Sequence, residues 1–160
     1  MSLGTEHRSQ EWWDRFFIGM AKYIATPSRD PSTQTGAVVV APDRTVVSMG
    51  YNGFARGVDD APERYSNREI KYSMVVHCEA NAIIFAHRNI AGCTLYTHPF
   101  MSCSRCAAMV IQAGIKRVVA PFSQNERWIA DFKLSTEQFD EAGVEIILLD
   151  GPKGGYKYLS

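Results

Sequence analysis

Three side chains suited to metal binding lie at the expected starts of two helices that a strand separates. His77 opens the first helix, and Cys103 and Cys106 form a C-x-x-C spacing at the start of the second. Residues three apart share one helix face, so both sulfurs can reach one ion. A C-x-x-C alone also fits a redox pair or half of a structural zinc knuckle. Together with His77, the two cysteines predict a tetrahedral zinc site with one open position, as catalytic zinc requires.

Glu79 stands two positions after His77 in the stretch VHCEANA. On a regular helix, residues at i and i+2 point to different faces, so the two can act together only at the first turn. A carboxylate there, beside the metal but not bound to it, can take a proton from water and deliver it elsewhere. H-x-E followed by C-x-x-C resembles the signature of zinc nucleobase deaminases.

The order of apolar segments predicts an α/β sheet with helices layered on its faces. The expected elements are a helix over 11–25, a hairpin over 36–41 and 45–50, a long loop over 53–76 with one helical turn, a helix over 77–88, a strand over 93–97, a helix over 103–113, a strand over 115–120, a helix over 125–142 that breaks near Leu134 and Ser135, and a strand over 144–149. Several apolar positions of the first helix are expected to face the core: Trp12, Phe16, Ile18, Met20, Ala21 and Ile24.

Length and charge narrow the classes of protein. A chain of 160 residues predicts one domain, with residues 1–8 expected to be a tag or disordered. Seventeen basic and 17 acidic residues balance, which argues against binding of long nucleic acid through charge and leaves a small anionic ligand possible. No apolar run suits a membrane span or signal peptide, and close cysteine pairs fit a reducing compartment. We therefore expect a soluble, cytoplasmic protein.

Over about residues 10–150 the sequence resembles the cytidine and deoxycytidylate deaminase superfamily, and most closely its zinc-dependent dCMP deaminases. Besides HCEANAI and CSRCA, the resemblance rests on DPSTQTGAVVV over 30–40 and GYNGFARG over 50–57. It implies a three-layer α/β/α sandwich with a central mixed sheet of about five strands. It also implies one Zn²⁺ held by His77, Cys103 and Cys106, with Glu79 as the catalytic proton shuttle. The implied reaction is hydrolysis of dCMP to dUMP and ammonia.

The substrate contacts are expected near the glycine-rich segments. By resemblance, Asn52 would bind the sugar, although an Asn-Gly turn is the alternative interpretation. The backbone of Gly36 and Ala37 would help to form the base pocket. Arg56, in a glycine-flanked loop, is the first candidate for the phosphate.

Other side chains are weaker candidates for substrate binding. The further cationic candidates for the phosphate are Arg29, Arg64, Arg68 and Lys71. His98 and Phe100 precede the ligand cysteines and line the base pocket in one interpretation or serve packing in the other.

The sequence departs from the family at the loop before the first cysteine. Ser102 stands where the family usually has proline, and the loop over 97–102 is one residue longer than the common form. Ser102 is a good N-cap residue, so the following helix is expected to begin there. Cys78, where alanine is common, is interpreted as a small buried residue.

Several alternatives stay open at this stage. The substrate could be a free nucleoside or another amino-heterocycle. A tRNA adenosine deaminase would need a basic surface, which the zero net charge disfavours. A non-catalytic zinc-stabilised binding module is disfavoured by the presence of Glu79. The resemblance further implies a homo-oligomer, commonly a hexamer, with dCTP and dTTP as effectors. Tyr65 and Trp128, if exposed, could make subunit contacts, or they could belong to the core.

Overall fold

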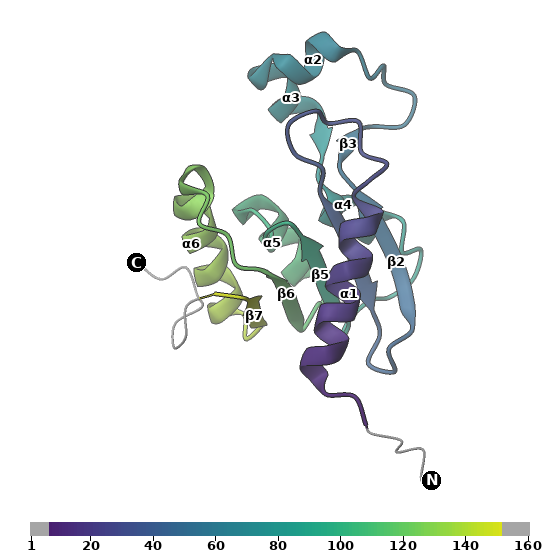
Figure 1. Ribbon diagram of the computed structural model, residues 1–160, viewed down its shortest axis with the longest axis vertical. Helices are drawn as coiled ribbons and strands as arrows, with labels where there is room; N and C mark the ends of the chain where they lie inside the picture. The colour runs from purple at the N-terminus through teal and green to yellow at the C-terminus, as the bar shows by residue number, and fades with distance from the viewer. Residues whose placement is uncertain (1–6, 152–160) are drawn as a thin grey trace, which may run out of the picture.

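The computed structural model describes residues 7–151 (Figure 1). Most of residues 1–8, which were expected to be a tag or disordered, therefore lies outside the described residues. In chain order the elements are α1 (Gln10–Ile24), β1 (Gly36–Val40), β2 (Val46–Tyr51), β3 (Gly53–Phe54), α2 (Pro62–Ser66), α3 (Arg68–Met74), β4 (Val75–Val76), α4 (Cys78–Ile84), β5 (Thr94–His98), α5 (Ser104–Gln112), β6 (Arg117–Pro121), α6 (Glu126–Glu141) and β7 (Glu145–Leu149).

The central sheet has five strands in the order β2-β1-β5-β6-β7. Strand β1 is antiparallel to both β2 and β5, whereas β5, β6 and β7 are parallel. Gly36 pairs with Tyr51 on one side and with His98 on the other, so the start of β1 and the ends of β2 and β5 share one edge of the sheet. The mixed five-stranded sheet implied by the resemblance is confirmed.

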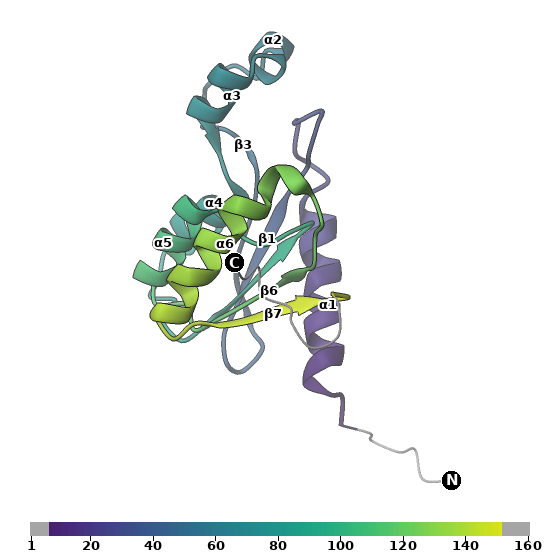
Figure 2. The ribbon, with the colours of Figure 1, turned by 90° about the vertical axis from the view of Figure 1, so that its left-hand side faces the viewer.

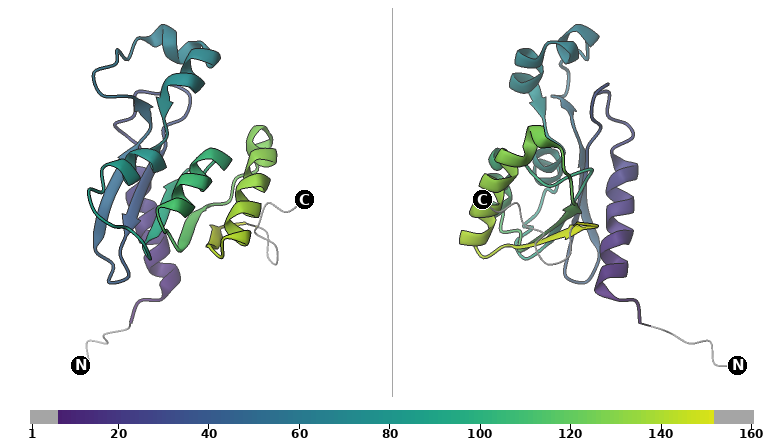
Figure 3. Two further views of the ribbon diagram at one scale, coloured as in Figure 1. Left: turned by 180° about the vertical axis from the view of Figure 1, so that it is seen from behind. Right: turned by 60° about the vertical axis from the view of Figure 1, so that its left-hand side comes forward.

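Helices cover both faces of this sheet. Figures 2 and 3 show α1 alone on one face and α4, α5 and α6 on the other. All five residues of β1 are buried, and their side chains alternate between two apolar cores. Val38 and Val40 lie in the core under α1, while Ala37 and Val39 lie in the core under the other three helices. The strand is apolar throughout because both of its faces are covered.

The inward face of α1 differs from the predicted stripe. Its buried residues are Asp14, Phe17 and Ala21, and Trp12 and Phe16 are 38% and 44% exposed. Spacings of three and four place the buried residues on one face of the helix. Of the predicted core positions, Ala21 is buried and Ile18, Met20 and Ile24 pack against the core, whereas the aromatic Trp12 and Phe16 lie beside the buried face. A charged residue, Asp14, takes one of the buried positions.

The segment 53–76 is not the long loop that the sequence predicted. It forms a two-stranded ribbon of β3 and β4 and the two short helices α2 and α3, which project beyond the sheet (Figures 1 and 2). Asn67 separates the helices, and its side chain caps α3 by accepting a hydrogen bond from the Ile70 amide. The capping residue provides the local signal for this helix that the prediction overlooked.

The helix after the histidine is shorter than predicted. It ends at Ile84 rather than at about residue 88, and His87 follows with a positive φ of 53°. Ile84 is 61% exposed, whereas Cys78 and Ala82 are buried. The helix lies directly on β2 because Gly50 has no side chain: a Cβ there would stand 2.5 Å from the Ala82 amide nitrogen.

One predicted helix boundary and one predicted helix break also differ from the structure. Cys103 rather than Ser102 is the N-cap of α5, and Gly114 ends that helix with a positive φ of 85°, as expected of a residue just beyond a helix. Helix α6 runs without the predicted break at Leu134 and Ser135. The Ser135 hydroxyl donates to the carbonyl of residue 131 one turn earlier, so it remains compatible with a continuous helix.

None of the helices within residues 7–151 combines the length and apolarity needed to cross a membrane.

Candidate active site

The fold brings three metal-binding side chains together. His77 caps the N-terminus of α4, and Cys103 caps the N-terminus of α5, which carries Cys106 in its first turn. The Nδ1 atom of His77 lies 3.5 Å from the Cys103 sulfur and 3.4 Å from the Cys106 sulfur. The three ligand atoms all lie within 4.8 Å of one another. The two helices point their N-termini at one place.

These distances fit a tetrahedral zinc ion. With Zn–N and Zn–S bonds of about 2.0 and 2.3 Å, a tetrahedral angle puts a nitrogen and a sulfur ligand about 3.5 Å apart. The donor set of one imidazole and two thiols is also the set that zinc prefers. Three protein ligands leave a fourth position for a water or substrate atom.

The ionisation of the cysteines agrees with this interpretation. A hydrogen bond with Cys106, and then one with His77, lower the pKa of Cys103 to about 4. The hydrogen bond to Cys103, together with burial, raises the pKa of Cys106. The pair therefore gives up one proton readily and shares the second. A divalent cation between the sulfurs would replace that shared proton.

Glu79 lies in the first turn of α4, as the spacing from His77 required. Its side chain is 5% exposed and lines the cavity beside the metal ligands. The Cys78 thiol donates to its Oε2 atom over 3.4 Å. Buried carboxylates near a metal but outside its ligand set are positioned for proton transfer.

Helix α6 holds the turn that carries the first cysteine. The Ser135 hydroxyl donates to the Ser102 carbonyl over 2.8 Å, and the Gln138 side-chain amide donates to the Ser104 carbonyl over 3.0 Å. Ser102 is therefore held through its backbone rather than serving as the helix cap. These bonds connect the metal ligands to a helix that is distant in sequence.

A cavity of about 360 Å³ opens above the metal ligands. Its size falls within the range of small-molecule sites. Its floor includes His77, Glu79 and Cys103, and aromatic side chains form part of its wall. These aromatic lining residues are Tyr65, Tyr72, Phe100, Trp128 and Phe132.

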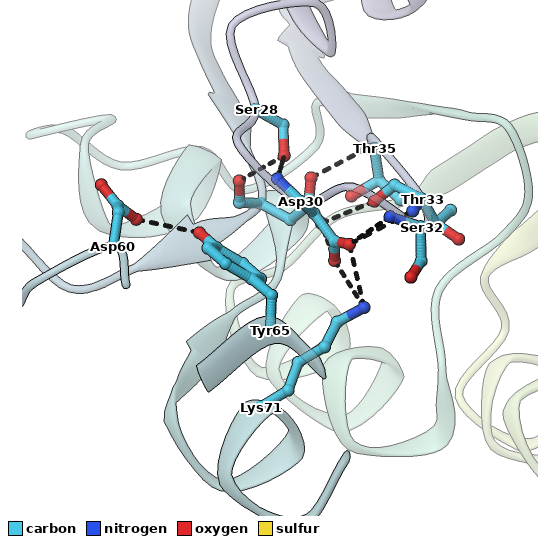
Figure 4. A network of polar contacts seen from close by, with 9 residues as sticks. Ser28, Asp30, Ser32, Thr33, Thr35, Asp60, Tyr65 and Lys71 are labelled. Atoms are coloured by element: carbon cyan, nitrogen blue, oxygen red, sulfur yellow. Dashed lines mark hydrogen bonds and ion pairs between the residues drawn. The ribbon is translucent and has the colours of Figure 1, made fainter. Parts of the chain in front are cut away.

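A buried polar network forms one side of this cavity (Figure 4). Asp30, 4% exposed, accepts hydrogen bonds from the amides of Ser32 and Thr33 and pairs with Lys71 of α3 over 2.8 Å. The Asn52 amide nitrogen donates to Asp30 and to the Thr33 carbonyl, and its oxygen accepts from the Thr35 amide over 2.8 Å. Both donor hydrogens of Asn52 are therefore used to hold the loop over 30–35.

The structure places only some of the predicted substrate contacts at the cavity. Asn52 and Phe100 line it, whereas Gly36, Ala37, Arg56 and His98 are not among its lining residues. Each of these four residues contacts other parts of the structure instead.

Gly36 and His98 lie toward α1. A Cβ on Gly36 would stand 2.1 Å from the Ala21 carbonyl oxygen, so this glycine permits close packing of α1 on β1. Burial, and then the charge of Lys22 on α1, lower the pKa of His98. Ala37 is fully buried in the apolar core. Arg56 lies with its guanidinium 5.3 Å from the centre of the Phe85 ring.

Several cavity residues were missed or assigned another role. Tyr65 is 4% exposed and stacks on Phe54 at 4.3 Å, and Trp128 packs near Phe100 and Phe132, so neither is a freely exposed contact residue. Arg127 was not considered. The sequence signal for Arg127 is its position a few residues after β6. The carboxyl ends of the parallel strands β5 and β6 meet at one end of the sheet, so the segment that follows β6 lies near the site.

Comparisons with known proteins agree with this architecture. A family model described as "Cytidine and deoxycytidylate deaminase zinc-binding region" matches residues 11–121. An uncharacterized deaminase of Aliivibrio fischeri is 41% identical over 140 residues, covering 86% of this chain and 93% of the relative. A probable deoxycytidylate deaminase of Caenorhabditis elegans is 38% identical over 144 residues, covering 88% and 71%.

A solved structure shares the fold. The dCMP deaminase of cyanophage S-TIM5 superposes with a TM-score of 0.69 at 20% identity, covering 89% of this chain and all of that one. The same phage enzyme has also been solved in complex with dCMP and dUMP.

Proposed function

The chain belongs to the cytidine and deoxycytidylate deaminase family, and from that premise we propose that it hydrolyses dCMP to dUMP and ammonia. The observation that carries the proposal is the cluster of His77, Cys103 and Cys106, with the buried Glu79 beside it, where His77, Glu79 and Cys103 line a cavity of about 360 Å³. The relatives named deoxycytidylate deaminase support dCMP as the substrate.

The metal ligands and Glu79 divide the chemistry between them. Zinc held by His77, Cys103 and Cys106 would act as a Lewis acid that makes water nucleophilic near neutral pH. Glu79 accepts one proton of the attacking water and delivers it to N3 of the pyrimidine, and it then transfers the second proton of that water, from the oxygen now bound to C4, to the leaving amine. Oxygen adds to C4, the bond from C4 to the amino nitrogen breaks, and ammonia leaves.

The walls of the cavity suit the rest of the substrate. Phe100, Trp128 and Phe132 provide an apolar surface against which a pyrimidine ring can pack. The hydroxyls of Ser32, Thr33 and Thr35 come from the loop that Asn52 holds, beside the same cavity. We assign Asn52 to the sugar side of the site, through its oxygen and through this loop.

The specificity constant for ammonia release tests the proposal. Zinc-loaded protein is assayed on dCMP, CMP, deoxycytidine, cytosine and 5-substituted dCMP, and dCMP is expected to give the highest value. Activity on deoxycytidine alone would indicate that the substrate is a free nucleoside rather than a nucleotide. Zinc-loaded, folded protein without activity on any of them would favour another amino-heterocycle or a non-catalytic zinc module.

We further propose that the protein is a homo-oligomer, a hexamer by family resemblance. Large apolar side chains on edge strand β2 and at the end of α4 support a subunit contact: Met49, Tyr51, Ile84 and Phe85 are 43–61% exposed. We also propose dCTP and dTTP as effectors. Light scattering with and without each nucleotide tests both points, and a single monomer mass under all conditions contradicts them.

A cytoplasmic location is part of the same proposal. Cys78, Cys93, Cys103 and Cys106 are all free thiols, which fits a reducing compartment. Fractionation of the native host with detection by antibody tests the location.

A further inference from the structure

The charged groups of the cavity are unevenly distributed. Its lining includes three cationic side chains, Arg68, Lys71 and Arg127, and two carboxylates, Asp30 and Glu79. Glu79 lies at the metal end, with His77 and Cys103. The two arginines come from the first turns of α3 and α6, which are far apart in sequence. They bring positive charge to the site from two elements.

Lys71 is already neutralised. Its ammonium lies 2.8 Å from Asp30, and the two side chains are only 13% and 2% exposed. Arg68 and Arg127 differ, because neither forms an ion pair with any residue in the range 7–151. Their sequence neighbours Glu69 and Glu126 are acidic but do not line the cavity. The cavity thus holds two uncompensated guanidinium groups.

Arg127 is also held in place by aromatic rings. Its guanidinium carbon lies 5.5 Å from the ring centre of Tyr72 on α3 and 5.5 Å from that of Trp128 on α6. Such contacts orient the planar guanidinium while leaving its N–H groups free to bind an anion. Arg127 also lies in the first turn of the 16-residue helix α6, whose positive end favours negative charge.

We propose that Arg127 and Arg68 form the subsite for the 5′-phosphate of the substrate, so that they select a nucleotide over a nucleoside. This inference rests on the proposed deamination of dCMP and extends it. A phosphate dianion between the two guanidinium groups would receive charge-assisted hydrogen bonds from both. Arg56, the first candidate from the sequence, lies over Phe85 and outside the cavity lining.

Removing each charge while keeping a polar side chain tests the subsite. We compare Arg127→Gln and Arg68→Gln with the wild type on dCMP and on deoxycytidine. Loss of one charge-assisted contact is expected to lower kcat/KM for dCMP about 10- to 100-fold. The value for deoxycytidine is expected to stay within about twofold, since that substrate has no phosphate for the arginines to bind. Arg88→Gln, an exposed arginine outside the cavity lining, is the matched control and should change neither value.

Product binding gives a readout that does not require turnover. Calorimetry with dUMP and deoxyuridine should show weaker binding of dUMP alone in Arg127→Gln and Arg68→Gln. Arg127→Lys, which keeps the charge but loses the planar fork, should retain part of the dUMP affinity. Thermal unfolding of each variant checks that the fold is retained.

The outcomes separate this inference from the proposed function. If the wild type prefers dCMP but both glutamine variants keep that preference, the subsite assignment is overturned and dCMP deamination stands. If Arg56→Gln instead loses the preference for dCMP over deoxycytidine, the phosphate subsite would be assigned to the segment over 53–57. If the wild type itself does not distinguish dCMP from deoxycytidine, the nucleotide assignment and the subsite both fall.

Discussion

Asp131 of α6 binds the N-terminus of α5 through both of its carboxylate oxygens. It accepts one hydrogen bond from the Ser104 backbone amide, over 2.8 Å, and another from the Ser104 hydroxyl, over 2.6 Å. Ser104 directly follows Cys103, so this contact fixes the turn in which both cysteine ligands lie. A carboxylate at a helix N-terminus also complements the helix dipole.

Replacement of Asp131 should weaken metal binding without direct loss of a ligand. Groups that orient metal ligands typically change affinity about 10- to 100-fold, and we expect a loss of that size in Asp131→Ala. Competition with a chromophoric chelator measures it. Glu137→Gln, on an exposed position of the same helix, is the control. Wild-type zinc affinity in a folded Asp131→Ala protein would show that Ser104 is not needed to position the cysteines.

Glu79→Gln should separate catalysis from metal binding. The amide cannot exchange the proton, so turnover is expected to fall about 10²- to 10⁴-fold while one zinc per chain remains. Cys106→Ala should instead reduce the zinc content. Metal analysis and ammonia release on the same samples distinguish the two effects, with Glu141→Gln as an exposed acidic control. Near-normal turnover by zinc-loaded Glu79→Gln would contradict the proton-shuttle role.

The ion pair of Asp30 and Lys71 should hold α3 against the loop that Asn52 anchors. Lys71→Met leaves a buried carboxylate without its partner, which typically costs about 3–5 kcal/mol of unfolding free energy. We also expect faster amide hydrogen exchange in α3 and in residues 30–35. Lys116→Met, an exposed lysine, serves as the reference for both measurements. Unchanged exchange in α3 would mean that other contacts hold this helix.

Asp14 under α1 should make the fold sensitive to acid. Burial alone would raise its pKa, but hydrogen bonds from Arg117, Gln10 and Tyr96 outweigh burial and lower it. Since the unfolded pKa is about 3.9, the ionised carboxylate stabilises the fold above about pH 4. That stabilisation is lost as the pH falls through the lower, folded pKa.

Asp14→Asn tests this acid sensitivity. At pH 7 we expect the unfolding free energy to fall by about 3 kcal/mol, because Arg117 loses its buried partner at 2.6 Å. The gap between variant and wild type should narrow below pH 4, as urea unfolding at several pH values can show. Asp150→Asn, which removes the exposed pair with Arg15, should matter much less. A gap that stays constant with pH would contradict the lowered pKa.

The residues of the metal centre could be predicted because their signal is local. The spacing of His77 and Glu79, and that of Cys103 and Cys106, predicts which side chains lie together at the start of a helix. Such a prediction depends on only a few neighbouring residues. The same holds for β1, whose short β-rich run before a turn predicted a hairpin strand. The zinc-binding class and the family resemblance followed from such patterns, and the resemblance in turn implied the mixed sheet.

The walls of the cavity could not be predicted in this way. In the sequence, Arg68 is one of four weaker phosphate candidates and Arg127 looks like an ordinary surface charge, while Arg56 stands in a more suggestive glycine-flanked loop. Only the packing of α3 and α6 around the sheet edge decides which arginines line the cavity. Sequence thus determined the chemistry of the metal centre, since its ligands are set by short spacings. The tertiary structure decided which cations line the cavity, since they come from helices far apart along the chain.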